Sequence, residues 1–291
     1  MCRQLFTIIS REAISTLIQL LNAYRKAVWY DPLLEKIRGV RSHCEGVGVV
    51  IASATNGSWR IYYERFDANE YAGDSCMVNL SALDAIIERV REIVVGGGWD
   101  RLVVMMHSRR ASRGEPRGTL YAHPFHYSVI GSHGAIDLFF SHNGGVDKNQ
   151  LANTLNIRGP LNVYSDSFLA GLFLSNMLSK GYNIVTATRR LSSFVKSTSA
   201  LNLNILALSS DGVKTRVKAY VVGLLGHKAE KDPNLRAYYE PILVRGRGLI
   251  GYVSSTVRDY CSTMSGLSFN ILNSELVEID PMTLSYSVVK L

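Results

Sequence analysis

Cys2 is the residue of this sequence with the clearest chemical potential, because removal of the initiator Met1 would make it the N-terminal residue. A free α-amino group has a reference pKa of about 7.7–8.0, close to the value of about 8.5 for a cysteine thiol. The amine of Cys2 could therefore take the proton of its own thiol, which is a recognised way to activate a nucleophile for attack on an amide. Many chains carry a cysteine at position 2 by chance, so this residue needs supporting chemistry elsewhere.

Three short polar segments, residues 107–114, 142–145 and 165–167, could supply that support. Attack of a thiolate on a carboxamide creates an oxyanion, which needs preorganised hydrogen-bond donors. The side-chain amide of Asn143 and the backbone N–H of Gly144 suit this role, since glycine lets the backbone approach closely. The alternative for Asn143-Gly144 is a hairpin turn, for which this dipeptide is a preferred sequence.

Arg109 and Asp166 carry charges that could select the head group of a free amino acid. The planar guanidinium of Arg109 suits bidentate capture of an α-carboxylate, and its alternative is a solvated charge at a strand end. Asp166 could bind an α-ammonium group. Its alternative is a helix N-cap, a role for which Ser165 competes.

The order and spacing of these segments, with Met1-Cys2-Arg3 ahead of them, resemble the class II glutamine amidotransferases, the glutaminase branch of the N-terminal nucleophile hydrolases. The segment Ala122-His123-Pro124-Phe125 falls where that family has its own His-Pro step. Ser42-His43-Cys44-Glu45-Gly46-Val47-Gly48 further resembles the His-x-Asp-Gly-Trp-Gly segment of the small, stand-alone branch. Five motifs in order are far more specific than any one of them.

The resemblance implies that the Cys2 thiolate attacks the side-chain amide of glutamine, forms a γ-glutamyl thioester, and releases ammonia and then glutamate. It implies an oxyanion hole, a clamp for the α-carboxylate and α-ammonium groups, and two further residues that line the pocket. The residues matched to these roles are Cys2, Asn143 and Gly144 in catalysis, and Arg109, Asp166, Ser112 and His123 in substrate binding.

The fold implied by the resemblance is α+β, a four-layer αββα sandwich with two stacked, mainly antiparallel sheets. Residues 1–291 would form a single glutaminase domain with no attached synthetase domain. A separate synthetase subunit could then receive the ammonia. Two other interpretations stay open: hydrolysis of another γ-glutamyl amide, and a non-catalytic module of the same fold that binds glutamine, a protein partner or RNA. No cofactor is expected.

Three residues depart from the family pattern. Phe168 stands where an acidic residue usually follows the Asp-Ser step, which puts the start of that helix and the ammonium site in question. Val47 and Glu45 replace the tryptophan and the aspartate of the small branch. These changes could alter specificity without touching the nucleophile.

Two other patterns are weaker. Residues 246–251 match G-x-G-x-x-G, but the residues that follow are strand-like, so we predict a glycine-rich hairpin and not a dinucleotide site. His123, His126, His133 and His142 have no carboxylate or cysteine partner at ligand spacing, so no metal site is predicted.

The composition fits one sizeable α+β domain, with 47% hydrophobic residues in 291. The 32 basic and 24 acidic residues are dispersed, so no nucleic-acid partner is expected. The four cysteines, Cys2, Cys44, Cys76 and Cys261, form no C-x-x-C pair and no regular framework, which favours a reducing, cytoplasmic setting. Neither a signal peptide nor a membrane span is expected, and the oligomeric state is not predicted.

The elements that must position the polar segments follow from the hydrophobic pattern. Helical spacing predicts helices over 14–24, over 80–94 with Asn79 as cap, and over 166–178 and 184–195. Residues 4–9 form a short apolar segment. Strand-like runs lie at 46–52, 60–64, 102–106, 135–140, 203–208, 215–224, 242–245, 249–253, 267–272 and 285–290, with hairpin-type turns at 210–212 and 273–274. Two of these strands end in a histidine, which places chemically active residues at strand ends.

Overall fold

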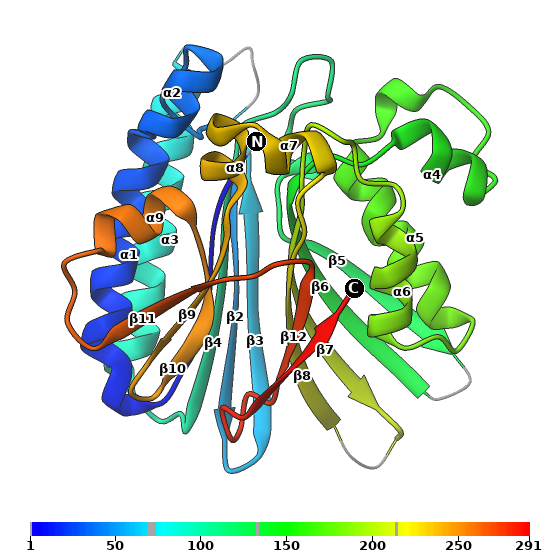
Figure 1. Cartoon of the computed structure of the whole chain (residues 1–291). Coiled ribbons are helices and arrows are strands. Elements are labelled where there is room, and N and C mark those ends of the chain that lie inside the picture. The colour runs from blue at the N-terminus through cyan, green and yellow to red at the C-terminus, as the bar shows by residue number, and fades with distance from the viewer. Residues whose placement is uncertain (1, 69–73, 132–133, 213–214) are drawn as a thin grey trace.

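The computed structural model describes all residues except 1, 69–73, 132–133 and 213–214. Within the described residues the strands form two stacked sheets, and helices cover the outer face of each sheet (Figure 1). Every pair of neighbouring strands in these sheets is antiparallel. The predicted α+β fold, a four-layer αββα sandwich, is therefore confirmed.

The first sheet has the strand order β11-β9-β10-β1-β4-β2-β3, and the second has the order β13-β12-β8-β7-β6-β5. The strands of the first sheet are β1 (Cys2–Ile9), β2 (Val47–Thr55), β3 (Ser58–Phe66), β4 (Arg101–Arg109), β9 (Pro241–Gly246), β10 (Leu249–Ser254) and β11 (Leu267–Ile271). Those of the second are β5 (Phe125–Gly131), β6 (Gly134–Gly144), β7 (Leu201–Ser210), β8 (Thr215–Gly223), β12 (Glu275–Ile279) and β13 (Tyr286–Lys290).

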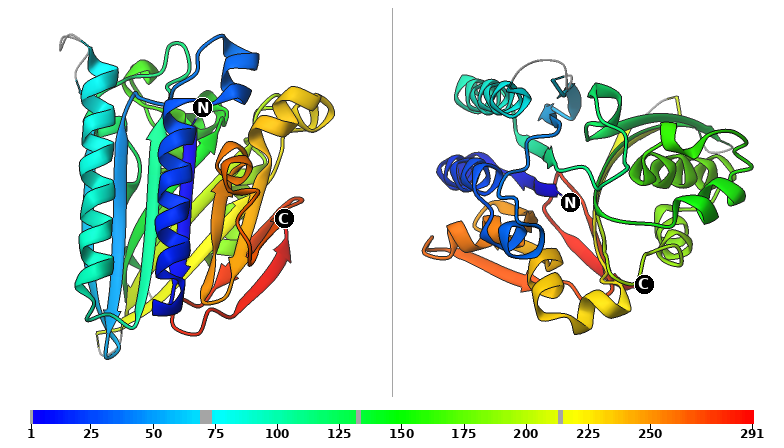
Figure 2. Two further views of the ribbon diagram at one scale, coloured as in Figure 1. Left: turned by 90° about the vertical axis from the view of Figure 1, so that its left-hand side faces the viewer. Right: turned by 90° about the horizontal axis from the view of Figure 1, so that it is seen from above.

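The helices fall into three groups (Figures 1 and 2). The first sheet is covered by α1 (Ile14–Trp29), α3 (Ser75–Gly96) and α9 (Ser255–Cys261). The second is covered by α4 (Lys148–Thr154), α5 (Asp166–Ser179) and α6 (Ile184–Ser192). The short helices α2 (Pro32–Arg38), α7 (His227–Lys231) and α8 (Pro233–Tyr239) lie at the end of the sandwich where β1 begins. Single 3₁₀ turns are found at Arg11–Ala13, Thr119–Tyr121 and Leu161–Val163.

Strand β1 shows how the sequence builds these layers. Its side chains alternate between two faces, so Leu5 and Ile9 pack in the core beneath α1 and α3, while Phe6 and Ile8 pack in the core between the sheets. By the same alternation Cys2 lies on the face turned toward the second sheet. Seen from above, the start of β1 is near the middle of the molecule, between the two helix layers (Figure 2).

Two local predictions are wrong. Asn79 does not cap the second long helix, because α3 begins at Ser75 and the carboxylate of Asp74 accepts the backbone N–H of Met77. Asn79 is instead a buried residue within that helix, where its amide donates to the backbone oxygen of Cys44. Residues 273–274 do not form a hairpin turn, since β11 and β12 on either side of them belong to different sheets.

The other elements follow the pattern closely. The glycine-rich segment 246–251 is a β9–β10 hairpin as predicted, and β7 pairs with β8, although residues 213–214 of their connection lie outside the described residues. Strands β5 and β12, and the five short helices α2, α4, α7, α8 and α9 found among the described residues, were not predicted. None of the helices in the described ranges combines the length and the apolar character needed to cross a membrane.

The cysteine spacing predicted no disulfide framework, yet Cys44 and Cys76 are joined by a disulfide. This bond ties the segment that precedes β2 to the first turn of α3. The two partners are 32 residues apart, which is why no short-range pattern revealed them. Cys2 and Cys261 are free and buried thiols.

Candidate active site

Cys2 is the first residue of β1 and lies directly opposite Arg109, the last residue of β4. Its side chain is 5% exposed and faces the gap between the two sheets. Cys2 itself pairs with β4, and the pairing of β1 with β10 begins at Leu5, so the thiol lies at the end of a strand that is held on both sides. The sequence therefore places its candidate nucleophile at the end of a central, rigid strand.

Asn143 approaches Cys2 from the second sheet, at the end of β6. The backbone N–H of Cys2 donates to Asn143 Oδ1 over 3.0 Å. The other amide atom, Asn143 Nδ2, is buried and has no hydrogen-bond partner among the described residues. A buried amide donor without a partner is costly, so this N–H group is available to an acceptor that enters the site.

Gly144 follows Asn143 within β6, with φ of +139°. A Cβ atom at this position would collide with the carbonyl oxygen of Ala200 and would lie 2.9 Å from His142 Nε2. Both the backbone conformation and the close approach therefore require glycine. The hairpin-turn interpretation of Asn143-Gly144 is wrong, because the two residues pair with Asn202 and Leu201 of β7.

Arg109 is a buried cation, with 4% of its surface exposed. Its guanidinium donates to the carbonyl oxygen of Pro116 over 2.9 Å, and it forms no ion pair with any carboxylate in the described part of the chain. The solvated-charge interpretation is therefore wrong. A buried charge without a counter-ion is costly, so this fork is suited to an incoming carboxylate.

Asp166 is the first residue of α5, and the N-cap is Ser165, whose hydroxyl accepts the N–H of Phe168 over 3.1 Å. Phe168 therefore does not change where the helix starts. The half-buried carboxylate of Asp166 accepts the N–H of Ser167 over 2.7 Å and that of Val146 over 3.3 Å. The N-cap interpretation of Asp166 is excluded, and its carboxylate keeps acceptor capacity for an ammonium group.

Ser112 and His123, the two further residues predicted to line the pocket, differ in their surroundings. Ser112 is exposed in the loop after β4, and among the described residues its side chain has no hydrogen bond to the other predicted site residues. His123 is buried, with its ring stacked on His107 at 4.1 Å between centroids. Neither ring nitrogen of His123 has a hydrogen-bond partner within the described residues.

Glu45 has a definite role in this structure. Its carboxylate accepts the backbone N–H of Ala111 over 2.8 Å and pairs with the guanidinium of Arg110 over 3.1 Å. The backbone of Glu45 also donates to the carbonyl of Arg109 over 2.8 Å. Glu45 therefore holds the start of the loop that follows Arg109, while Val47 is a buried core residue of β2.

The ionisation of Cys2 is set by opposing effects. Burial raises the pKa of the thiol, but the positive charge of the chain's N-terminus and the interaction with His107 lower it, with a net pKa of about 6. Burial also lowers the pKa of His142 to about 4 and that of His123 well below its usual value. Near pH 7 the Cys2 side chain is therefore a thiolate, and the rings of His123 and His142 are neutral.

His107 is a site residue to which the sequence reasoning gave no role. It lies in β4 two residues before Arg109, so the two side chains share a face, and it is 1% exposed. The two-residue spacing along a predicted strand was the signal that could have found it.

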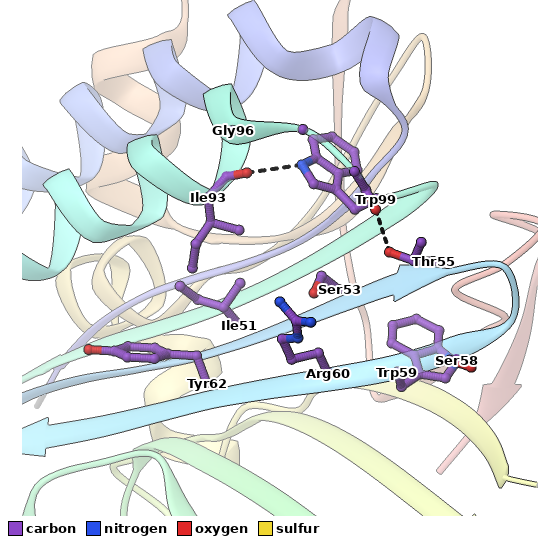
Figure 3. Close-up of a pocket in the computed structure, with 12 residues that line it drawn as sticks. Ile51, Ser53, Thr55, Ser58, Trp59, Arg60, Tyr62, Ile93, Gly96 and Trp99 are labelled. Atoms are coloured by element: carbon purple, nitrogen blue, oxygen red, sulfur yellow. Dashed lines mark hydrogen bonds between the residues drawn. The ribbon is translucent and has the colours of Figure 1, made fainter.

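Within the described ranges no cluster of three or more histidine, cysteine or acidic side chains could hold a metal ion, and His133 lies outside those ranges. A cavity of about 560 Å³ lies elsewhere, lined by Trp59, Arg60 and Tyr62 of β3 and by the C-terminal end of α3 (Figure 3). It is at the opposite end of the first sheet from Cys2, because its Ser53 pairs with Leu102, which in turn pairs with Ile9. This cavity is separate from the candidate active site.

No model of a known protein family and no curated protein matches this sequence. Among solved structures, the chain is similar to the glutamine phosphoribosylpyrophosphate (PRPP) amidotransferase from B. subtilis in complex with ADP and GMP, with a TM-score of 0.53 and 14% identity over 99% of this chain and 49% of that one. It is also similar to a structure described as the allosteric regulatory enzyme of purine biosynthesis, with a TM-score of 0.54 and 14% identity over 99% of this chain and 48% of the other. This chain spans about half the length of these structures. The likeness shows the fold, which is the four-layer αββα sandwich implied by the resemblance.

Proposed function

We propose that this protein is a cysteine amidohydrolase of the class II glutamine amidotransferase type, which cleaves the side-chain amide of glutamine. The observation that carries the proposal is the contact between Cys2 and Asn143, in which one amide atom of Asn143 binds the Cys2 backbone and the other is buried without a partner. That arrangement leaves a hydrogen-bond donor beside the thiol, where the oxyanion of an attacked carboxamide would form.

The chemistry follows from these groups once Met1 is removed. The Cys2 α-amine takes the thiol proton, and the thiolate attacks the amide carbon of the substrate. Asn143 Nδ2 and the N–H of Gly144 bind the resulting oxyanion. Collapse of this intermediate breaks the carbon–nitrogen bond, so ammonia leaves with the transferred proton and a γ-glutamyl thioester remains. Water then hydrolyses the thioester to glutamate and restores the thiol.

Arg109 and Asp166 would hold the head group of the substrate. The guanidinium of Arg109, buried opposite Cys2, would bind the α-carboxylate, and the Asp166 carboxylate would bind the α-ammonium group. His123 would line the inner wall of the same pocket, and Ser112 would approach the substrate from the exposed loop. We further propose that residues 1–291 act as one domain, because the two sheets share one buried core, and that a separate synthetase subunit receives the ammonia released at Cys2.

An activity assay coupled to intact-mass analysis tests the proposal. Protein that has lost Met1 should release ammonia and glutamate from glutamine, and Cys2→Ala should abolish this hydrolysis while the circular dichroism spectrum is kept. Larger γ-glutamyl amides in the same assay test the alternative substrate class. Unchanged turnover in Cys2→Ala would refute the mechanism, and retention of Met1 in the native host without any amidase activity would support a non-catalytic binding module.

A further inference from the structure

His107 lies beside the nucleophile on the same face of the first sheet. In the β1–β4 ladder Cys2 is opposite Arg109, and Gln4 is opposite His107. Residues directly opposite each other project to the same side, and so do residues two apart on one strand. The side chains of Cys2 and His107 are therefore diagonal neighbours between the sheets, a spacing that a long side chain can bridge.

The hydrogen bond of His107 defines which ring nitrogen carries the proton. His107 Nε2 is 3.2 Å from the carbonyl oxygen of His142, and a carbonyl can only accept, so Nε2 carries the hydrogen. In the neutral ring the lone pair is then on Nδ1. That nitrogen is buried and has no hydrogen-bond partner among the described residues. The ring is held in place by the bond to His142 and by stacking on His123 at 4.1 Å.

We propose that His107 is a second catalytic base for Cys2, with Nδ1 as the atom that accepts the thiol proton. The step converts the thiol and neutral imidazole into a thiolate and an imidazolium. After the thiolate attacks, the imidazolium returns the same proton to the nitrogen that leaves as ammonia, so the ring ends the acylation step neutral. This inference rests on the proposed amidohydrolase function, and it means that activation of Cys2 does not depend on its α-amine alone.

The surroundings of Cys2 are consistent with this pairing. Despite the opposing effect of burial, the pKa of Cys2 is lowered to about 6 by the N-terminal charge, by His107 and by a hydrogen bond from the backbone of Arg110. The titratable and charged groups around the pair are the N-terminus, Arg109, Asp166, His123, His142, Tyr24, Tyr238 and Tyr239. Burial raises the pKa of all three tyrosines, so they remain neutral in the range where Cys2 titrates.

The pH dependence of Cys2 alkylation by iodoacetamide tests the pairing without any turnover. The substitution His107→Gln keeps an amide N–H that can donate to the His142 carbonyl but removes the basic nitrogen. We expect the midpoint of the alkylation profile, near pH 6 in the wild-type chain, to rise by at least one unit in this variant. Subtracting the signal of Cys2→Ala removes the contribution of Cys261, the other free thiol.

The matched control is His126→Gln, because His126 lies in β5, pairs with Asp137 over 3.1 Å and is partly exposed. This control should keep the wild-type midpoint. An unshifted midpoint in a folded His107→Gln protein would overturn the inference, and His107→Asn provides a second variant if the first does not fold.

Turnover separates this inference from the proposed function. With glutamine as substrate, His107→Gln should lower kcat by about 10²–10⁴-fold, the usual contribution of a general acid–base group, while KM changes little. A wild-type protein that hydrolyses glutamine together with an unchanged kcat in His107→Gln would reject the second base but keep the amidohydrolase. A shifted alkylation profile in a protein without amidase activity would keep the pairing and reject the amidohydrolase.

Discussion

The two buried arginines near Cys2, Arg3 and Arg109, differ in the number of partners that their guanidinium groups have. Arg3 points toward the helix layer and is fully buried, with hydrogen bonds to Asp31, to the carbonyl of Tyr238 and to the hydroxyl of Thr256. Its guanidinium also stacks on the Tyr238 ring at 4.2 Å. Arg109 points between the sheets and binds one carbonyl, that of Pro116.

This difference favours a structural role for Arg3 and supports the ligand-binding role proposed for Arg109. The carboxylate beside Arg3 accepts from several donors, including His43 Nε2 at 2.6 Å and the Thr256 hydroxyl at 2.7 Å. The face that contains Arg109 instead holds several polar atoms without partners among the described residues, namely Asn143 Nδ2, His107 Nδ1 and both ring nitrogens of His123. Unpartnered atoms also occur around Arg3, at His43 Nδ1 and the Tyr238 hydroxyl, so the contrast rests on the charges. The Arg3 guanidinium faces a buried carboxylate, whereas the Arg109 guanidinium faces none among the described residues, which favours the Arg109 side as the binding site.

The largest effect on stability should come from removing the charge of Arg3, which is paired with Asp31. Arg3→Met would leave the buried Asp31 carboxylate without its ion-pair partner, and breaking a buried pair in this way costs about 3–5 kcal/mol. Urea unfolding of Arg3→Met should therefore show a free energy of unfolding lower by about that amount. Unfolding of Cys2→Ala, whose side chain has no ion pair, is the control and should change far less. Equal stability of Arg3→Met and wild type would contradict the structural role of Arg3.

The next effect should come from the other side of β1 and should appear in turnover. Asn143→Ala removes the donor proposed for the oxyanion, and loss of one such donor costs about 10²–10³-fold in kcat. Its stability cost should stay near 1 kcal/mol, the usual net value of the single hydrogen bond to Cys2. Steady-state kinetics of this variant measure the loss in kcat, and urea unfolding measures the stability cost. A stability loss as large as that of Arg3→Met would remove the distinction between the two faces.

Much of this fold was readable from sequence because its elements are long and periodic. Apolar spacing predicts the helices near residues 14–29 and 166–179 and the strand that ends at Arg109. Strand β5 alternates buried and exposed residues only in part. Helices α2 and α8 each begin with an Asp cap before a proline, which is a local start signal, but their seven residues are too few to show an apolar period. Residues 273–274 were misread because crossing between sheets is a tertiary event that no turn dipeptide encodes.

Some residues of the candidate site could be predicted from the sequence, and others could not. Cys2 could be found from its position after Met1, and Arg109 and the Asn143-Gly144 step could be found from the order of the motifs. The sheet register and the contact between the sheets then bring these residues together. The disulfide partner of Cys44 and the pairing of His107 with Cys2 depend on register and on contacts between distant segments. Such contacts become visible only when the strands are aligned.

On the Arg3 side of β1, His43 should make the free energy of unfolding depend on pH. Burial lowers the pKa of His43 from 6.5 to about 4, more than its bond to Asp31 raises it. The unfolded chain therefore binds this proton first as the pH falls, so stability present above about pH 6.5 is lost down to about pH 4. The loss attributable to His43 is on the order of 3 kcal/mol. Urea unfolding at several pH values should show it, and His43→Gln should flatten the profile. His142 contributes a similar loss in the same range and stays in both proteins, so an identical slope would show that His43 is not responsible.

The smallest effect should come from Arg109. In contrast to Arg3→Met, its substitution should weaken substrate binding and leave stability intact. Arg109→Met removes a buried charge that has no carboxylate partner in the described part of the chain, so the free energy of unfolding should hold or rise. Binding should suffer instead, because a charge-assisted hydrogen bond contributes about 1.5–3 kcal/mol, which corresponds to roughly a 10- to 100-fold increase in KM for glutamine. An α-carboxamide analogue of glutamine should be used equally poorly by both proteins, since it offers no carboxylate to the guanidinium. An unaltered KM for glutamine would show that Arg109 does not bind the head group.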